Sequence, residues 1–302
     1  MIYTATLNPA LDYVVNVEGG LIPGSINRAI REEIVFGGKG INVSTILHNL
    51  EIDTVALGFV AGFTGTALET GLDAQGISHD FIHLSEGMTR INIKVKGKEE
   101  SEINGNGPEI SETAKQELMH QIRRLKEGDI LVLAGSIPSS LPDDIYEQML
   151  KQLDHRKVLT VVDTTGERLK KVISYHPFLI KPNNLELGEL FHKTLQTEEE
   201  IVLHAKELQR MGARNVLISM AGDGAILVDE NGNVTKQLPC KGTVKNSVGA
   251  GDSMVAGFLA GYLETGDYTH ALKLGTAAGG ATAFSVGLAK KEQIMKLYQT
   301  IA

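Results

Sequence analysis

Short apolar runs alternate with longer amphipathic segments along most of the chain. Six short runs, most of them apolar on both sides, predict buried strands at Ile2–Leu7, Thr54–Val60, Ile130–Ala134, Val158–Asp163, Phe178–Lys181 and Val216–Met220. Helical spacing of apolar residues predicts helices at Ile41–Leu50, Thr66–Gln75, Ser111–Leu125, Asp143–Leu153, Leu185–His192, Glu198–Met211, Asp252–Glu264, Tyr268–Ser285 and Lys290–Thr300. This alternation predicts a doubly wound α/β domain, with a mainly parallel sheet covered by helices on both faces.

Two stretches, residues 11–36 and 88–104, depart from this alternation of buried strands and helices. They have the pattern of strands with one polar face. In the second stretch Ile91, Ile93 and Val95 alternate with polar residues before a Gly97-Lys98 turn, as in a half-exposed antiparallel hairpin. We expect these strands to form a small β layer inserted into one domain of residues 1–302. The layer would act as a lid or as a dimer surface, and an edge hairpin without a role fits the pattern as well.

Composition narrows the classes of protein and of partner. The 302-residue chain is 42% hydrophobic and 22% charged, as in soluble globular proteins, and its net charge of −8 argues against binding to nucleic acid or to an anionic membrane. Cys240 is the only cysteine, which excludes an internal disulfide and a cysteine-based zinc module. The first four residues lack signal-peptide features, and no run approaches the ~18 apolar residues of a membrane span. We expect a cytoplasmic protein.

The segment Val248-Gly249-Ala250-Gly251-Asp252-Ser253 carries the strongest chemical signal. Its two glycines precede a predicted apolar helix, so they can present backbone N–H groups at the positive end of the helix dipole, where an anion is favoured. Asp252 lies in the first turn, where an aspartate is also a common helix cap. Amides for a phosphoryl group beside a carboxylate that accepts a hydroxyl proton describe phosphoryl transfer.

No P-loop and no dinucleotide-binding glycine motif occurs, so a nucleotide would have to bind in another way. Lys39 lies within the glycine-rich segment Gly37-Gly38-Lys39-Gly40. Because glycine weakens helices and strands, we expect this segment to be a loop that closely approaches another group. A long, flexible cation in such a loop is suited to phosphate.

Three motifs in order resemble those of the ribokinase-like sugar kinases, the phosphofructokinase-B family. They are Gly37-Gly38-Lys39-Gly40-Ile41-Asn42, Lys181-Pro182-Asn183-Asn184-Leu185-Glu186 and the Val248–Ser253 segment. The resemblance covers essentially the whole chain and implies a ribokinase-like fold with a β-sheet lid. It also implies that ATP and Mg²⁺ are bound and that a ketohexose phosphate is the acceptor.

Other segments are similar to those of family members that convert fructose 1-phosphate to fructose 1,6-bisphosphate. These segments are Thr6-Leu7-Asn8-Pro9 with Asp12, Thr89–Lys94, Ile103-Asn104-Gly105 and Gly135-Ser136-Ile137-Pro138. A tagatose-6-phosphate kinase that gives tagatose 1,6-bisphosphate is the alternative within the family, and a non-catalytic sugar-phosphate sensor is an alternative of another class. The resemblance further suggests a homodimer formed through the lid.

The resemblance also implies roles for individual residues. Asp252 would be the catalytic base, and the amides of Gly249, Ala250 and Gly251 would form the hole for the γ-phosphoryl group. Asp12, Gly38, Asn42 and Asn92 would bind the sugar, and Lys39 and Arg90 would hold its phosphate. ATP would be bound by Lys181, Asn183, Ser219, Gly222, Gly224 and Gly251, and Asn183 and Glu186 would place Mg²⁺.

The residues themselves support some of these roles and leave alternatives for others. Asp163, Asn183 and Ser219 fall near the carboxyl ends of predicted parallel strands, where doubly wound sheets bind ligands. An asparagine followed three residues later by a glutamate is also a capping-box pattern, so Asn183 and Glu186 could simply cap a helix. Arg90 could be an exposed charge at a strand end.

Overall fold

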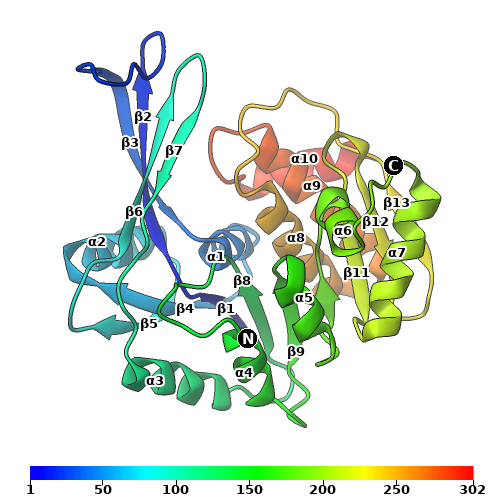
Figure 1. Cartoon of the computed structure of the whole chain (residues 1–302). Helices are drawn as coiled ribbons and strands as arrows, with labels where there is room; N and C mark the ends of the chain where they lie inside the picture. Colours follow the sequence, from blue (N-terminus) through cyan, green and yellow to red (C-terminus); the bar gives the residue numbers. More distant parts are fainter. Residues whose placement is uncertain (302) are drawn as a thin grey trace.

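The computed structural model describes residues 1–301, and their strands form two sheets (Figure 1). The main sheet has nine strands in the order β13-β12-β11-β10-β9-β8-β1-β4-β5. These are β1 (Ile2–Thr6), β4 (Thr54–Ala61), β5 (His79–Leu84), β8 (Ile130–Ala134), β9 (Leu159–Asp163), β10 (Leu179–Ile180), β11 (Asn215–Ser219), β12 (Ala225–Val228) and β13 (Val234–Gln237). All neighbouring pairs from β5 to β11 are parallel, and β12 and β13 add an antiparallel edge.

Each of the six predicted strands is present in the main sheet. The predicted Phe178–Lys181 run is shortened to Leu179–Ile180, because Pro177 and Pro182 bracket it and lack the N–H that a ladder needs. A turn at Asn231-Gly232 joins β12 to β13. β5, β12 and β13 were not among the predicted runs, since polar residues interrupt the apolar residues of β5 and the other two strands are only four residues long.

Helices cover both faces of the main sheet, as the apolar runs predicted. They are α1 (Lys39–Asn49), α2 (Gly62–Ala74), α3 (Glu112–Arg123), α4 (Ile145–Lys151), α5 (Gly166–Ile173), α6 (Asn184–Leu190), α7 (Glu198–Met211), α8 (Ala250–Thr265), α9 (Tyr268–Ala283) and α10 (Lys291–Thr300). The core on one face receives side chains from α3 to α7, and the core on the other face from α1, α8, α9 and α10. The short helix α5, with four charged residues, was not predicted. No helix within residues 1–301 is long and apolar enough to cross a membrane.

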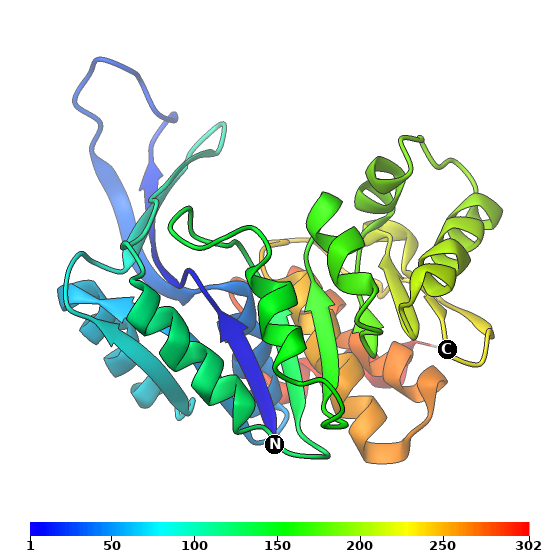
Figure 2. The same ribbon diagram turned by 60° about the horizontal axis from the view of Figure 1, so that its bottom comes forward.

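The four remaining strands form a second sheet, called here the outer sheet, in the order β3-β2-β6-β7. They are β2 (Ala10–Val17), β3 (Ala29–Gly37), β6 (Arg90–Lys96) and β7 (Ser101–Asn104), which lie in the two stretches that broke the sequence pattern. β6 and β7 form the predicted antiparallel hairpin, whereas β2 and β6 pair in parallel. The outer sheet projects from the body of the molecule in both views (Figures 1 and 2).

The base of the outer sheet is anchored to the body through α2. Leu11, Phe36 and Ile91 join an apolar cluster that includes Leu68 of α2. The ring of Phe36 lies directly over Gly71, where an added Cβ would come 2.0 Å from a ring carbon. Such a side chain cannot fit without displacing the ring, so glycine at this position lets the outer sheet sit close to the helix.

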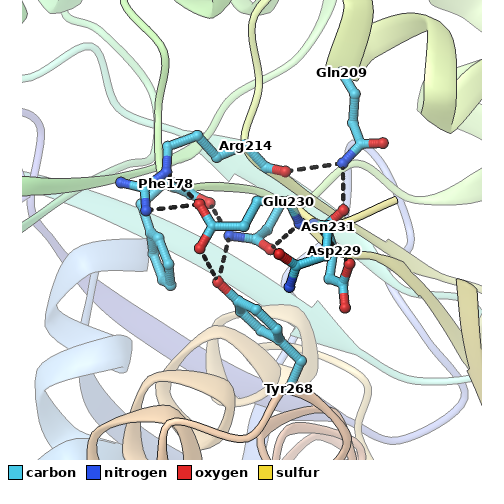
Figure 3. A network of polar contacts seen from close by, with 8 residues as sticks. Phe178, Gln209, Arg214, Asp229, Glu230, Asn231 and Tyr268 are labelled. Carbon is cyan, nitrogen blue, oxygen red and sulfur yellow. Dashed lines mark hydrogen bonds and ion pairs between the residues drawn. The ribbon is translucent and has the colours of Figure 1, made fainter. Parts of the chain in front are cut away.

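A polar network closes the amino ends of β10 and β11 (Figure 3). Asn215, fully buried, donates from Nδ2 to the carbonyl of Phe178 at 2.8 Å and accepts from the N–H of Glu230 at 2.9 Å. Arg214 Nε donates to Glu230 Oε2 at 2.7 Å, and the Tyr268 hydroxyl donates to Oε1 at 2.5 Å. The hydrogen bond from Arg214 holds the pKa of Glu230 below its ordinary value. This network ties the β12–β13 turn to α9 at the end of the sheet opposite the carboxyl edge, where doubly wound sheets bind ligands.

Candidate active site

The buried side chain of Asp252 lies in the first turn of α8. Gly249 precedes the helix with a φ of 79°, and Asp252 is the third helical residue, with only 5% of its surface exposed. Its Oδ2 accepts a hydrogen bond of 2.8 Å from Nδ2 of Asn42, which lies in the first turns of α1. Gly249, Ala250, Gly251 and Asp252 therefore share one helix start, where amides of the first turn lack intrahelical acceptors.

Burial raises the pKa of Asp252 to about 6, and the neighbouring charge of Asp163 acts in the same direction. The hydrogen bond from Asn42 and the ammonium groups of Lys39 and Lys181 oppose this rise. A carboxyl group with a pKa just below neutrality is ionised at physiological pH, and it is basic enough to accept a proton from an alcohol in a transition state. The environment of Asp252 therefore suits a general base.

Two lysines converge on Asp163, the last residue of β9. Its Oδ2 lies 3.6 Å from Nζ of Lys39 and its Oδ1 lies 3.6 Å from Nζ of Lys181. Lys181, which follows β10, is 5% exposed, and a Cβ added to Gly251 would lie 3.2 Å from its Nζ. The ammonium of Lys181 therefore lies beside the first turn of α8, where it adds positive charge to that of the helix dipole.

Opposing effects act on the pKa of Lys39. Desolvation lowers it, but the carboxylates of Asp163, Asp252 and Glu186 together outweigh desolvation, so the pKa is raised and the side chain stays protonated. Asp163 was noted in the sequence only for its place at a strand end and was not among the predicted site residues. An aspartate that ends an apolar run was the signal that could have identified it.

The glycine-rich segment around Lys39 is not the loop that was expected. Gly37 ends β3, and Lys39 and Gly40 form the first turn of α1, which Thr6 Oγ1 helps to hold by accepting from the N–H of Ile41 at 3.0 Å. The expected close approach is confirmed. An added Cβ would come 2.4 Å from Thr6 at Gly38, whose φ is 130°, and 2.5 Å from Thr6 at Gly40.

Asn183 and Glu186 form the capping box that was the alternative interpretation of their spacing. The N–H of Asn183 donates to Glu186 Oε2, and the N–H of Glu186 donates to Asn183 Oδ1, both at 2.8 Å. No protein donor within residues 1–301 bonds to the second oxygen of Glu186. Mg²⁺ is usually bound by one or two carboxylates, together with phosphate oxygens and water. The described residues contain no cluster of three side chains able to hold a metal, so only such a partial set of oxygen ligands fits here.

The segment after β11 lies next to this capping box. Asn183 and Ser219 form a parallel β-bridge, and the N–H of Ser219 donates to the carbonyl of Pro182 at 3.3 Å. Gly222 is exposed in the short 3₁₀ helix Ala221–Asp223, with open space around it. Gly224 has a φ of 92°, and an added Cβ would come 2.1 Å from the carbonyl oxygen of Gln237, so packing by itself requires glycine there.

The remaining predicted residues lie at the base of the outer sheet. Asn92, opposite Asp12 in the strand register, donates from Nδ2 to Asp12 Oδ1 at 2.8 Å. Arg90 is half-buried and not an exposed strand-end charge, since its Nε donates to the carbonyl of Asn8 at 3.1 Å and its Nη2 to Ser136 Oγ at 3.4 Å. Burial lowers the pKa of the Arg90 guanidinium, although Asp12 opposes this effect.

The turn at Gly135-Ser136 lies between the residues at the base of the outer sheet and Lys39 at the start of α1. Ser136 is bonded to Arg90, and a Cβ added to Gly135 would lie 3.7 Å from Cβ of Lys39. Lys39 and Arg90 therefore border the same turn, one from α1 and one from the outer sheet. Ser136 was not predicted as a site residue, although it lies two residues after the apolar strand β8, close to a strand end as Asp163 is.

Comparison with known proteins places the chain among sugar kinases. The family model described as pfkB family carbohydrate kinase matches residues 5–294. The chain is 46% identical to a 1-phosphofructokinase of Bacillus subtilis (strain 168), over 98% of this chain and 97% of that protein. It is 41% identical to a D-tagatose-1-phosphate kinase of Bacillus licheniformis, over 99% and 97% of the two chains.

Solved structures have the same architecture. Phosphofructokinase-2 from Escherichia coli, in complex with fructose-6-phosphate, superposes with a TM-score of 0.92 at 26% identity, over 99% of this chain and 98% of that chain. A ribokinase from Arabidopsis thaliana, complexed with ribose and ATP, has a TM-score of 0.82 at 20% identity, over 99% and 98% of the two chains. The second likeness shows the fold alone, and it confirms the ribokinase-like α/β class expected from the sequence.

Proposed function

Because the chain belongs to the pfkB family of carbohydrate kinases, which transfer a phosphoryl group to an alcohol, we propose that it converts fructose 1-phosphate to fructose 1,6-bisphosphate. The γ-phosphoryl group of ATP would pass to the free hydroxymethyl group of the sugar in the cytoplasm. The observation that carries this proposal is the buried carboxylate of Asp252 in the first turn of α8, hydrogen-bonded to the half-buried Asn42 and beside the ammonium of Lys181.

In this reaction Asp252 accepts the proton of the attacking hydroxyl. Asn42, predicted to bind the sugar, would also orient the Asp252 carboxylate through its hydrogen bond. The amides of Gly249, Ala250 and Gly251 and the ammonium of Lys181 stabilise the charge of the transferring group, which is the main requirement of phosphoryl transfer. Asp252 and Lys181 are fixed by burial, so these two groups need little reorganisation during the reaction.

The other predicted residues would bind the two substrates. Asp12, Gly38 and Asn92 contact the sugar, and Lys39 and Arg90 hold its phosphate on either side of Ser136. Lys181, Asn183, Ser219, Gly222 and Gly224 hold ATP at the carboxyl edge of β10 and β11. Mg²⁺, when bound, would neutralise phosphate charge, and Asn183 and Glu186 are the residues that would hold it, with the second oxygen of Glu186 as the available ligand.

We further propose that the outer sheet is both a lid and a dimer surface. Ile30, Ile34 and Ile103 expose 69%, 55% and 62% of their surface on it, a concentration of apolar area that a second copy of the chain could cover. A closed lid would keep water, a competing acceptor, away from the phosphoryl group.

The relatives also favour a second candidate substrate. One relative is named D-tagatose-1-phosphate kinase, so tagatose 1-phosphate is the sugar to compare with fructose 1-phosphate. The two sugars differ in the configuration of one hydroxyl, which few contacts can distinguish. Tagatose 6-phosphate and a non-catalytic sensor are not favoured.

A coupled assay of ADP release with purified protein, ATP and Mg²⁺ tests the proposal. We expect kcat/KM to be highest for fructose 1-phosphate, followed by tagatose 1-phosphate, with fructose 6-phosphate, tagatose 6-phosphate and fructose far lower. A preference for a 6-phosphate or for an unphosphorylated sugar would contradict the assigned substrate. Absence of turnover with every ketohexose phosphate would contradict the kinase assignment itself.

The pH dependence of kcat/KM tests Asp252 as the base. Since the pKa of Asp252 in the free protein is raised to about 6 and the reaction needs the ionised form, kcat/KM should decline below an apparent pKa near 6. The hydrogen bond from Asn42 lowers this pKa, so Asn42→Ala should move the acid limb of the profile to higher pH. The sugar phosphate titrates in the same way in assays of wild type and of Asn42→Ala, so it cannot separate the two profiles. Acid limbs that coincide for the two proteins would therefore contradict the assignment of Asp252 as the base.

A further inference from the structure

Lys94 is an enclosed cation of the outer sheet to which the proposed reaction assigns no role. It lies on β6 two residues after Asn92 and four after Arg90, so the three side chains project from the same face of the strand. Only 12% of its side chain is exposed. Lysine side chains are mostly exposed in proteins, so the partners of this largely covered ammonium indicate what it does.

The partners of Lys94 are two carboxylates from different strands. Its Nζ lies 3.5 Å from Oδ2 of Asp12 on β2 and 3.4 Å from Oε1 of Glu102 on β7. Glu102 stands opposite Lys94 in the register of β6 and β7, and Asp12 stands opposite Asn92 in the register of β2 and β6. The three-strand pairing therefore places the ammonium between the two acids.

Both carboxylate oxygens of Asp12 are held from β6. Oδ1 accepts from Asn92 Nδ2 at 2.8 Å, and Oδ2 faces the ammonium of Lys94. The Asn92 amide is itself anchored, because its Oδ1 accepts from the N–H of Gly105 at 3.2 Å. Without Lys94, one oxygen of Asp12 would lose its partner, and Asp12 and Glu102 would repel each other across the vacated space. Because the site is partly shielded from water, this repulsion would be stronger than at an open surface.

We propose that Lys94 is a positioning residue that holds the carboxylate of Asp12 in the orientation needed to accept hydrogen bonds from the sugar hydroxyls. The inference rests on the proposed function in taking Asp12 as a contact of the sugar. Lys94 itself stays outside the reaction, so its loss should weaken binding of the sugar phosphate and leave ATP binding and the chemical step nearly unchanged. This selectivity separates positioning from a general contribution to the stability of the outer sheet.

The test compares Lys94→Met, which keeps the length of the side chain and removes its charge, with Lys94→Arg, which keeps the charge. Lys94→Met should raise KM for fructose 1-phosphate about tenfold, the effect of losing roughly 1.4 kcal/mol of binding. Its KM for ATP and its kcat should stay within about twofold of wild type, and Lys94→Arg should recover most of the affinity.

Lys96→Met is the matched control, because Lys96 lies on the same face of the same strand. It is 37% exposed and lies 3.9 Å from Glu100, in contact with neither Asp12 nor Asn92, so KM should not change. Equal effects of Lys94→Met and Lys96→Met, or a matching loss in kcat and in affinity for ATP, would overturn the positioning role.

A crystal structure of the Lys94→Met protein gives a readout that does not depend on turnover. The carboxylate of Asp12 should rotate away from Asn92 in this variant and stay in place in Lys96→Met. An unmoved Asp12 would overturn the inference whatever the activity. A wild-type protein without activity on ketohexose phosphates would contradict the proposed function alone, because the position of Asp12 would still test Lys94.

Discussion

Replacing Asp252 by asparagine is expected to lower kcat by about a thousandfold, within the range of ~10²–10⁴ that a general base contributes. The substitution keeps the size of the side chain and an oxygen that can accept the hydrogen bond from Asn42, but it removes the group that takes the proton. ATP should still bind, since Lys181 and the capping box of α6 are unchanged. Steady-state kinetics and calorimetric titration of ATP measure the two effects separately.

Stability provides the control for this variant. Because burial raises the pKa of Asp252 from 3.8 to about 6, the folded state favours the protonated carboxyl, and its ionisation weakens the fold as pH rises through 6. At pH 8 the neutral asparagine variant should therefore melt at the same temperature as wild type or higher. Asp154→Asn, at an exposed aspartate outside the site, should change neither rate nor melting temperature. Near-normal turnover in Asp252→Asn would remove Asp252 from the mechanism.

Replacing Arg90 by alanine is expected to raise KM for fructose 1-phosphate about 10- to 150-fold, since losing one hydrogen bond to a charged group costs roughly 1.5–3 kcal/mol and each 1.4 kcal/mol is tenfold. Arg90→Lys should recover only part of this loss, because an ammonium lacks the paired donors that match a phosphate. KM for ATP should be unaffected, because Arg90 belongs to the outer sheet and not to the edge of β10 and β11. Initial rates with each substrate varied in turn measure these values.

Unphosphorylated fructose separates phosphate recognition from damage to the site. Wild type and Arg90→Ala should use fructose with the same low kcat/KM, because this sugar has no phosphate for Arg90 to hold. Arg210→Ala, at an exposed arginine on α7, should leave all constants unchanged. An equal loss on fructose and on fructose 1-phosphate would show that Arg90 supports the base of the outer sheet through Asn8 and does not recognise the phosphate.

Much of the fold could be predicted from the sequence because its main signals are local. A strand buried between two layers of helices must be apolar along its whole length, and Thr54–Ala61 and Ile130–Ala134 have that pattern. α5 and β12 were not predicted because neither has such a local pattern. α5 is short and rich in charged residues, and β12 is too short to show a period. Packing against the sheet stabilises both.

The candidate site likewise has features that local sequence predicts and contacts that it does not. Neighbouring residues alone specify the order of the motifs, the helix start at Gly249–Asp252 and the alternating pattern of the outer sheet. Folding is needed to bring Asn42 to Asp252 across 210 positions of sequence, Asp163 to two lysines, and Lys94 between Asp12 and Glu102. Such contacts follow from strand order and register, which bring distant side chains together, and no local pattern in a single sequence records them.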